Sequence, residues 1–420
     1  MSSITDLAPE IQRRVSGFVR FLDGEGFSRP EIKNIDGLLS GMLKKHDVHV
    51  SVLSRSLHEK ISPKKTWERL SRNLKREGLG KRLICANMKK HRSEIQKKRD
   101  CVLDLSDIQK AYAVQMEGLS RVRDGDKSTH EKVTIGNGYY WINAVMADGE
   151  GILPIYSEIY SLDHEGKDCV SENSKLLGIT DMVHEVHPEA VYVLDRGGDR
   201  NEIMAPLHKD GKLFVIRGQE QRSLGLHKDS EKKTNIKTIA QKVNLCHIYK
   251  SQRNGEQFAV GIRRVYLDDV PLWLVASKRR GGGFSWYLTN VTGTATEIMN
   301  TVLEAYGLRW RIEEYHRQIK QDYGLERLCV RSYHAIKNMG VLVMLAASFC
   351  ARMPEHIVIR LLAFSNQLPR KRLCDIPKYP YYKIIAAVAY ILQLTEKRSY
   401  KPLNVRKREY FQFQLEFMGV

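Results

Sequence analysis

The stretch Val191-Tyr-Val-Leu-Asp-Arg-Gly-Gly-Asp199 indicates the centre of the fold. Its first four residues form an apolar, β-branched run, which is typical of a central buried strand in an α/β sheet. Asp195 follows directly, so a carboxylate lies where the strand ends. An aspartate here either caps a turn or contributes to a site at the edge of the sheet. Asp199 is an alternative to Asp195, although it lies farther out in the glycine loop.

Upstream of this strand, a second acid occupies a similar position. Asp104 ends a short apolar strand, and if the two strands are neighbours, Asp104 and Asp195 converge at one edge of the sheet. Asp107 is an alternative, but three residues on it falls on the other face of a continuing strand. Either aspartate taken alone could simply cap a turn. The remaining elements expected here are strands at 101–104, 132–135, 139–145 and 152–156, a hairpin turn at Gly136-Asn-Gly138 and a helix over 174–187.

Downstream, the sequence remains strand-like before it becomes helical. The basic loop Lys278-Arg-Arg-Gly-Gly-Gly283 has no helix start after it, so we expect a strand connection rather than a phosphate cradle. The longest apolar run, 339–351, is 13 residues long, which suits a buried helix and is too short to span a bilayer. Strands are predicted at 213–216, 258–260 and 272–275, and helices at 294–322 and 384–394.

The predicted helix 294–322 carries a polar stripe. Tyr306, Arg309, Glu313 and Lys320 lie at offsets of 0, +3, +7 and +14, which places them within about 60° of one another on a helix. The acid could hold a metal ion, and the two cations could hold phosphates. The alternative interpretation is a solvated, salt-bridged helix face.

Composition restricts the class of partner. The chain has 420 residues, 42% of them hydrophobic, with a net charge of +19 and a pI near 9.5. This charge favours a polyanion, and because no signal segment or membrane span is evident, we expect nucleic acid rather than lipid. Seven scattered cysteines with no C-x-x-C pair imply no disulfide framework or structural zinc site, and fit a reducing cytoplasm.

The first 100 residues are predicted to be helical and basic. Residues 60–99 contain 15 Lys or Arg against 3 Glu. Ser62-Pro63 predicts a helix start, after which Trp67, Leu70 and Leu74 share one side. Together with a short helix over 52–57, this resembles the outline of a helix-turn-helix. Any small basic bundle would give the same pattern, so both interpretations stay open.

Three carboxylates at one place would repel one another unless cations neutralised them. Asp104, Asp195 and Glu313 are the three candidates, and Mg²⁺ and Mn²⁺ prefer such oxygen ligands. Two such ions about 3.5–4 Å apart can activate the attacking oxygen and stabilise the leaving oxygen of a phosphodiester. The acid set therefore predicts two-metal chemistry on a nucleic-acid backbone.

These motifs resemble those of the DDE transposases of the bacterial insertion-sequence-4 group, over most of residues 101–350. The signature of that family is Tyr, two residues, Arg, three residues, Glu, six residues and Lys, and it is complete here from Tyr306 to Lys320. The family's Asp-Arg pair followed by another Asp is similar to Asp195-Arg-Gly-Gly-Asp199. Its first acid, in an Asp-x-Ser or Asp-x-Thr setting, is similar to Asp104-Leu-Ser106.

The resemblance implies an α/β fold. Its catalytic core would be ribonuclease-H-like, a mixed sheet flanked by helices, with a β-rich insertion and an N-terminal helical DNA-binding domain. It also implies that Arg309 and Lys320 grip phosphates of the transposon end and that Tyr306 positions that strand. Trp286 is the nearest match to an aromatic that stacks on a flipped base, with core packing as the alternative, and Arg217 is a further phosphate contact. The expected domains are the helical basic domain 1–100, the first part of the core 101–212, the insertion 213–290, whose first strand could belong to the core sheet, the rest of the core 291–350, and a helical region 351–420 for dimerisation or DNA contact.

The sequence therefore predicts a cytoplasmic, nucleoid-associated DNA transposase that acts on double-stranded DNA. By the resemblance, it would use two Mg²⁺ or Mn²⁺ ions, work as a homodimer and follow a cut-and-paste route through hairpin ends. Two alternatives stay open: a nuclease of the same fold, and a non-catalytic DNA-binding regulator derived from a transposase.

Overall fold

One mixed sheet runs through the protein. The structure is a computed structural model and describes residues 4–123, 133–165, 171–251, 255–364 and 381–399. Within these segments the strands follow the order β2-β3-β1-β5-β6-β12-β11-β10-β7-β8, while β4 pairs with β3 and β9 with β10. The strands are β1 (Asp100–Gln109), β2 (Ser120–Arg123), β3 (Ile135–Ala147), β4 (Ile152–Tyr160), β5 (Val191–Leu194), β6 (Leu213–Arg217), β7 (Ser223–Gly225), β8 (Lys233–Asn235), β9 (His247–Lys250), β10 (Gln257–Leu267), β11 (Val270–Arg279) and β12 (Phe284–Thr289).

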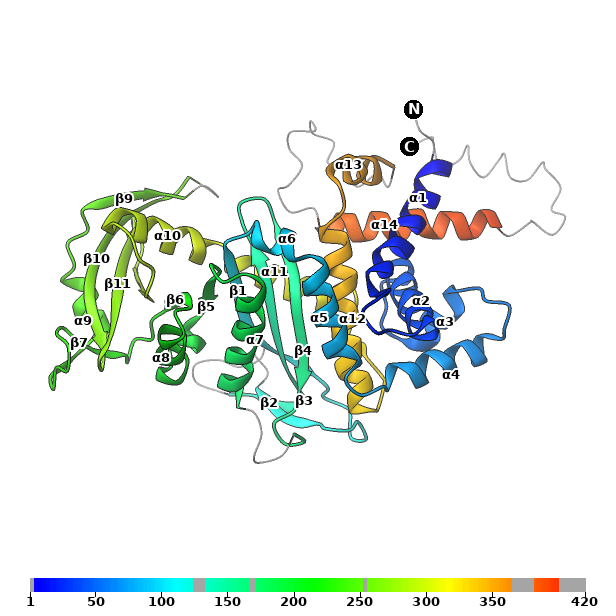
Figure 1. Ribbon diagram of the computed structural model, residues 1–420, viewed down its shortest axis with the longest axis horizontal. Helices are drawn as coiled ribbons and strands as arrows, with labels where there is room; N and C mark the ends of the chain where they lie inside the picture. Colours follow the sequence, from blue (N-terminus) through cyan, green and yellow to red (C-terminus); the bar gives the residue numbers. More distant parts are fainter. Residues whose placement is uncertain (1–3, 124–132, 166–170, 252–254, 365–380, 400–420) are drawn as a thin grey trace.

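Helices gather mainly at one end of this sheet. Figure 1 shows the N-terminal helices and α12–α14 on one side, the central strands with α7 and α8 in the middle, and β7–β11 with α9 at the other end. The helices are α1 (Ile4–Val19), α2 (Arg29–Lys45), α3 (Val50–Ser56), α4 (Pro63–Leu74), α5 (Leu79–Lys90), α6 (Arg92–Gln96), α7 (Glu172–Val186), α8 (Asn201–Lys209), α9 (Ile236–Gln241), α10 (Ala295–Gly307), α11 (Trp310–Gln321), α12 (Tyr333–Ala351), α13 (Glu355–Phe364) and α14 (Tyr381–Ser399).

The centre of the sheet is parallel. β5 lies between β1 and β6 and pairs in parallel with both, and all four of its residues are buried. Tyr192 of β5 donates a hydrogen bond to the Thr180 carbonyl of α7, which fixes this helix to the strand. The predicted central strand is therefore confirmed. β6, the first strand of the predicted insertion, continues the same sheet.

The predicted hairpin at Gly136-Asn-Gly138 is wrong. These residues lie inside the long strand β3, which pairs with β2 on one side and β1 on the other. A Cβ at Gly138 would lie 2.3 Å from the Ile108 carbonyl oxygen and 2.6 Å from a Val122 methyl carbon. The glycine therefore permits a close approach between three strands, which is another common use of this residue in sheets.

The strands between 213 and 290 extend the sheet rather than forming a separate one. β12 pairs with β6 antiparallel, and β11 and β10 follow in turn. The loop Lys278-Arg-Arg-Gly-Gly-Gly283 covers the end of β11 and the turn to β12, so the predicted strand connection is confirmed. The acid-bearing strands and the outer strands thus share one backbone ladder (Figure 1).

The N-terminal helices pack against the later helices. Asn338 of α12 is buried, donates to the carbonyls of Leu74 and Arg76, and accepts from the Gly80 N–H. Helix α12 is long and apolar enough to cross a membrane, but 83% of its most apolar 18 residues are buried inside the protein. It therefore serves as the buried helix that its apolar run predicts.

Helix α4 begins where Ser62-Pro63 predicts, since the Ser62 side chain accepts a hydrogen bond from the Lys65 N–H. Leu70 and Leu74 are fully buried, but Trp67 is 42% exposed, so its predicted place on the packed side is wrong. Thr66 takes that place, four residues before Leu70, while Trp67 lies at the edge of the apolar stripe. Of the predicted region 351–420, residues 365–380 and 400–420 lie outside the described segments.

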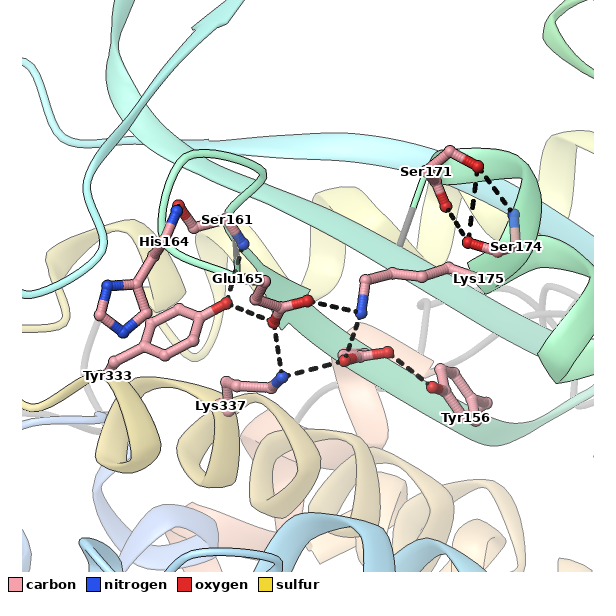
Figure 2. Close-up of polar contacts among 10 residues, drawn as sticks. Tyr156, Ser161, His164, Glu165, Ser171, Ser174, Lys175, Tyr333 and Lys337 are labelled. Carbon is pink, nitrogen blue, oxygen red and sulfur yellow. Dashed lines mark hydrogen bonds and ion pairs between the residues drawn. The ribbon is translucent and has the colours of Figure 1, made fainter. Parts of the chain in front are cut away.

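An ion cluster joins α7 and α12 to β4. It consists of Glu158, Glu165, Lys175 and Lys337, and each lysine contacts both carboxylates. Figure 2 shows both lysines beside Glu165. Lys175 lies 2.9 Å from Glu158 and 3.1 Å from Glu165, and Lys337 lies 3.1 Å and 2.8 Å from the same groups. We call these four residues the β4 ion cluster.

Candidate active site

The register of β1 and β5 brings the two predicted aspartates to neighbouring positions. Val102 pairs with Val193 in the parallel ladder. Asp104 and Asp195 each lie two residues farther along their chains, on the same side of the strands. The two strands are therefore neighbours, which was the condition for the two aspartates to converge.

Asp195 also has the turn-capping contact that the alternative interpretation predicts. Its Oδ1 accepts a hydrogen bond of 2.7 Å from the Gly197 N–H at the start of the 3-10 helix Arg196–Gly198. Capping and a site role are compatible, since this contact involves one of two carboxylate oxygens. Asp199, the alternative acid, is fully buried and accepts from Arg222 at 2.7 Å and from the Gln219 N–H at 2.6 Å. These contacts indicate that Asp199 shapes the loop.

Glu313 does not lie on one continuous helix with Tyr306, so that prediction is wrong. Helix α10 ends at Gly307 and α11 begins at Trp310. Between them the Leu308 and Arg309 N–H groups bond to carbonyls three residues back, as in a 3-10 turn. Gly307, which weakens a helix, lies at this break. Arg309 still reaches Glu313, and its guanidinium donates to Glu313 Oε1 at 2.5 Å.

The electrostatics of Asp104 indicate that the three acids are near one another. Burial, reinforced by the negative charge of Asp195, raises the pKa of Asp104 to about 7, while Arg309 acts in the opposite direction and Glu313 adds to the rise. Helix α11, which carries Glu313, packs against β1 and β3. Asp107, the alternative to Asp104, accepts a hydrogen bond from Gln109 instead.

The donor set suits a hard divalent cation. Carboxylate oxygens are the ligands that Mg²⁺ and Mn²⁺ prefer. Burial is the main cause of the raised pKa of Asp104, and the negative charges of Asp195 and Glu313, which a cation would neutralise, add to it. Among the described residues, however, no three His, Cys, Asp or Glu side chains lie close enough to hold an ion. Glu313, 54% exposed, is paired with Arg309 instead, so this side chain would have to leave Arg309 to join Asp104 and Asp195.

Two arginines lie near the ring of Tyr306. The Cζ atoms of Arg217 and Arg309 lie 6.0 and 5.6 Å from the centre of its ring. The ring of Tyr287 is 4.7 Å away, and Tyr287 pairs with Arg217 across β12 and β6. The structure thus brings together three residues that the resemblance assigns to DNA: Tyr306, Arg309 and Arg217.

Lys320 and Trp286, the other two residues predicted to contact DNA, have different surroundings from Tyr306, Arg309 and Arg217. Lys320, on α11, is 18% exposed and lies 3.3 Å from Glu326. Trp286 of β12 is only 6% exposed and packs so closely on Gly218 that a Cβ there would lie 2.8 Å from the indole Cδ1. The structure therefore gives Trp286 the core-packing role that was its alternative, and base stacking would require this side chain to move.

Three residues near Asp104 escaped the sequence prediction. His316 Nδ1 lies 3.5 Å from Asp104 Oδ2, its Nε2 lies 3.0 Å from the amide nitrogen of Asn143, and its ring lies 4.7 Å from that of Trp141. The signal for His316 was its spacing, because it follows Glu313 by three residues on the face that also carries Lys320. Asn143 had no such signal, since its place opposite Asp104 depends on the strand register.

Comparison with known proteins agrees with this geometry. Residues 160–349 match a family model described as Transposase DDE domain. The matched segment contains Asp195 and Glu313 and begins after the strand that carries Asp104. No curated protein matches the chain. This part of the chain is therefore similar to a transposase DDE domain.

Proposed function

We propose that the protein is a DNA transposase that cuts the ends of a mobile element and joins them to target DNA. The observation that carries the proposal is the position of Asp104 and Asp195, two residues beyond the last residue pair of adjacent parallel strands, where the charges of Glu313 and Arg309 also act on the Asp104 carboxylate. The match of residues 160–349 to a transposase domain supports it. The strand order β4-β3-β1-β5-β6, with three parallel central strands, supports the proposed ribonuclease-H-like core.

Asp104, Asp195 and Glu313 would hold two divalent cations, Mg²⁺ or Mn²⁺. When bound, such ions activate the attacking oxygen and stabilise the leaving oxygen of a phosphodiester. Arg309 has two roles in this proposal. In the free protein it neutralises Glu313 at 2.5 Å, and on the DNA it would grip a phosphate and so release Glu313 toward the aspartates.

The remaining side chains would hold the DNA end. Arg217 and Arg309 lie near the ring of Tyr306, so a phosphate beside this ring would meet two guanidiniums. Lys320 extends the positive charge along α11, and the exposed Lys64, Lys65 and Arg72 of α4 would add salt-sensitive contacts to the duplex. Action as a homodimer, a cut-and-paste route through hairpin ends and a place beside the nucleoid belong to the same proposal.

The experiment uses the DNA that flanks the gene. Short inverted repeats bordered by a direct duplication would identify the element ends, and these ends on a donor plasmid would be incubated with the protein, Mg²⁺ and a target plasmid. We expect both cut ends and joined products. Cut ends without joined products would indicate a nuclease, and DNA binding without cutting would indicate a regulator.

Variants identify the residues. Glu313→Gln, Asp195→Asn and Asp104→Asn should each abolish cutting while binding of the end persists. Glu314→Gln is the matched control, since Glu314 is the next residue and pairs with Arg317 at the surface. A variant that still cuts at the wild-type rate would remove that residue from the site.

A further inference from the structure

The imidazole of His316 is buried beside Asp104 and is held there by neighbouring side chains. His316 is 7% exposed and lies on α11, one turn after Glu313. Its ring lies 4.7 Å from the Trp141 ring, and the Trp141 indole N–H donates to Ser157 at 2.9 Å, which holds that indole in place. The imidazole is thus confined between a fixed aromatic ring and a carboxylate. An apolar side chain would fill the same space, so packing alone does not explain a histidine here.

Asn143 decides which nitrogen of this imidazole carries the proton. Its amide nitrogen, 3.0 Å from His316 Nε2, can only donate, so Nε2 accepts and the proton of the neutral ring lies on Nδ1. An imidazole whose Nε2 accepts a hydrogen bond carries one proton only and is neutral. Nδ1 then presents an N–H to Asp104 Oδ2, 3.5 Å away.

The opposite orientation of the Asn143 amide is less favourable. It would draw the proton to Nε2 and leave two acceptors, Nδ1 of His316 and Oδ2 of an ionised Asp104, facing each other at 3.5 Å. In the orientation found, Asn143 Oδ1 is buried with no hydrogen-bond partner among the described residues. That unsatisfied atom carries an energetic cost, which the fold tolerates while Nδ2 meets the imidazole.

The sheet itself builds this chain of contacts. Asn143 of β3 pairs with Asp104 of β1, and Trp141 lies two residues away on the same face of β3. One strand therefore supplies both the amide that orients His316 and the ring that confines it. Helix α11, which contacts both β1 and β3, supplies His316 together with Glu313, so one helix carries both an acid and the contact to Asp104.

We propose that His316, oriented by Asn143, is a positioning residue that holds one oxygen of Asp104 and leaves the other for a divalent cation. The inference rests on the proposed function, because it assigns Asp104 to a cation site. Partners of this kind fix the orientation of a ligating side chain, and their loss typically weakens metal binding about 10- to 100-fold.

Two variants of His316 test separately the contact of Nδ1 with Asp104 and the contact of Nε2 with Asn143. His316→Asn keeps an amide near the place of Nδ1, facing Asp104, whereas His316→Gln keeps one near the place of Nε2, facing Asn143. Binding of Mn²⁺ to the full chain in complex with the element end would be measured by electron paramagnetic resonance of the free ion, with the same DNA alone as the reference. We expect His316→Gln to weaken binding about 10- to 100-fold and His316→Asn to weaken it only a few-fold.

Thermal unfolding of the same proteins tests a merely structural role. Such a role would lower the melting temperature of both variants and leave their Mn²⁺ affinities equal, which would overturn the inference. If neither variant folds, Asn143→Leu tests the same contact, since it removes the donor to Nε2 and keeps the imidazole. We expect about a tenfold loss of Mn²⁺ affinity, and an unchanged affinity would overturn the inference.

Asp104→Asn distinguishes failure of this inference from failure of the proposed function. If Asp104→Asn abolishes Mn²⁺ binding and His316→Gln does not weaken it, only the role of His316 is wrong. If Asp104→Asn binds Mn²⁺ as well as the wild type, or if the wild type binds none at millimolar concentration, the cation site fails and the role of His316 fails with it.

Discussion

Removing Lys175 should destabilise the protein by more than a surface lysine would. Lys175 is 8% exposed and contacts both carboxylates of the β4 ion cluster. Losing one partner of a buried pair typically costs about 3–5 kcal/mol. Because Lys337 still contacts Glu158 and Glu165, and these carboxylates keep some contact with water, we expect about 2–3 kcal/mol for Lys175→Met. Urea unfolding followed by circular dichroism gives the value.

A double-mutant cycle tests the reasoning directly. Glu158→Gln alone leaves two lysines with one carboxylate and should cost a similar amount. The double variant keeps Lys337 and Glu165 as a neutral pair at 2.8 Å, so its cost should fall below the sum of the single costs by about 1–3 kcal/mol. Additive costs would refute the idea that the four charges act together.

The control cycle uses an exposed pair. Lys233 and Asp268 form an ion pair in which the side chains are 44% and 57% exposed. Screening by water limits such pairs, so Lys233→Met and Asp268→Asn should show a coupling below about 1 kcal/mol. A coupling as large as that of the β4 ion cluster would mean that burial is not the cause.

The cluster also predicts how stability depends on pH. Although burial opposes the change, hydrogen bonds from Lys337 and Tyr333 lower the pKa of Glu165 from 4.5 to about 2. This carboxylate is more acidic in the folded state, so its stabilising effect is complete above about pH 4.5 and is lost as the pH falls toward 2. The difference corresponds to about 3 kcal/mol. The difference in unfolding free energy between the wild type and Glu165→Gln should therefore be about 2 kcal/mol smaller at pH 3 than at pH 7, and a constant difference would contradict the assignment.

Two further predictions concern DNA binding and the sheet. Lys320→Ala should weaken binding of the element end and reduce the slope of log affinity against log salt by about 1, and an unchanged slope would exclude a phosphate contact. Gly138→Ala should destabilise the fold by more than about 2 kcal/mol because the new Cβ would lie 2.3 Å from the Ile108 carbonyl oxygen. Gly149→Ala is the matched control, since a Cβ there meets nothing within 4 Å, and equal stabilities of the two variants would show that this close approach has no energetic effect.

Local patterns were enough to predict the elements that carry the acids. Val191 to Leu194 is a short apolar run, and only a strand buried on both faces suits such a sequence. The neighbouring position of Asp104 and Asp195 followed from assuming that their strands pair, which the register bears out. What the sequence could not supply was Asn143, because its contact with the site depends on how β3 aligns with β1.

The errors arose where one residue type serves two purposes. Glycines on both sides of an asparagine suggested a turn, but Gly138 serves a close approach of strands. The spacing of the polar residues from Tyr306 to Lys320 suggested one helix, but the spacing of side chains does not reveal a 3-10 turn at Leu308. The pairing of Arg309 with Glu313 was also beyond reach, since spacing shows which side chains can meet and not which contact prevails.

The uninterrupted ladder from β2 to β8 has a mechanical consequence. Among the described residues, backbone pairing links the strand of Asp104 to the outermost strands, so we expect the sheet to resist folding around a bound duplex. The curvature needed for wide contact would come from the DNA, at about 1–6 kcal/mol for a moderate bend. DNA ends that contain easily kinked base-pair steps would then bind more tightly, so the affinity of a stiff protein would depend on the deformability of the DNA.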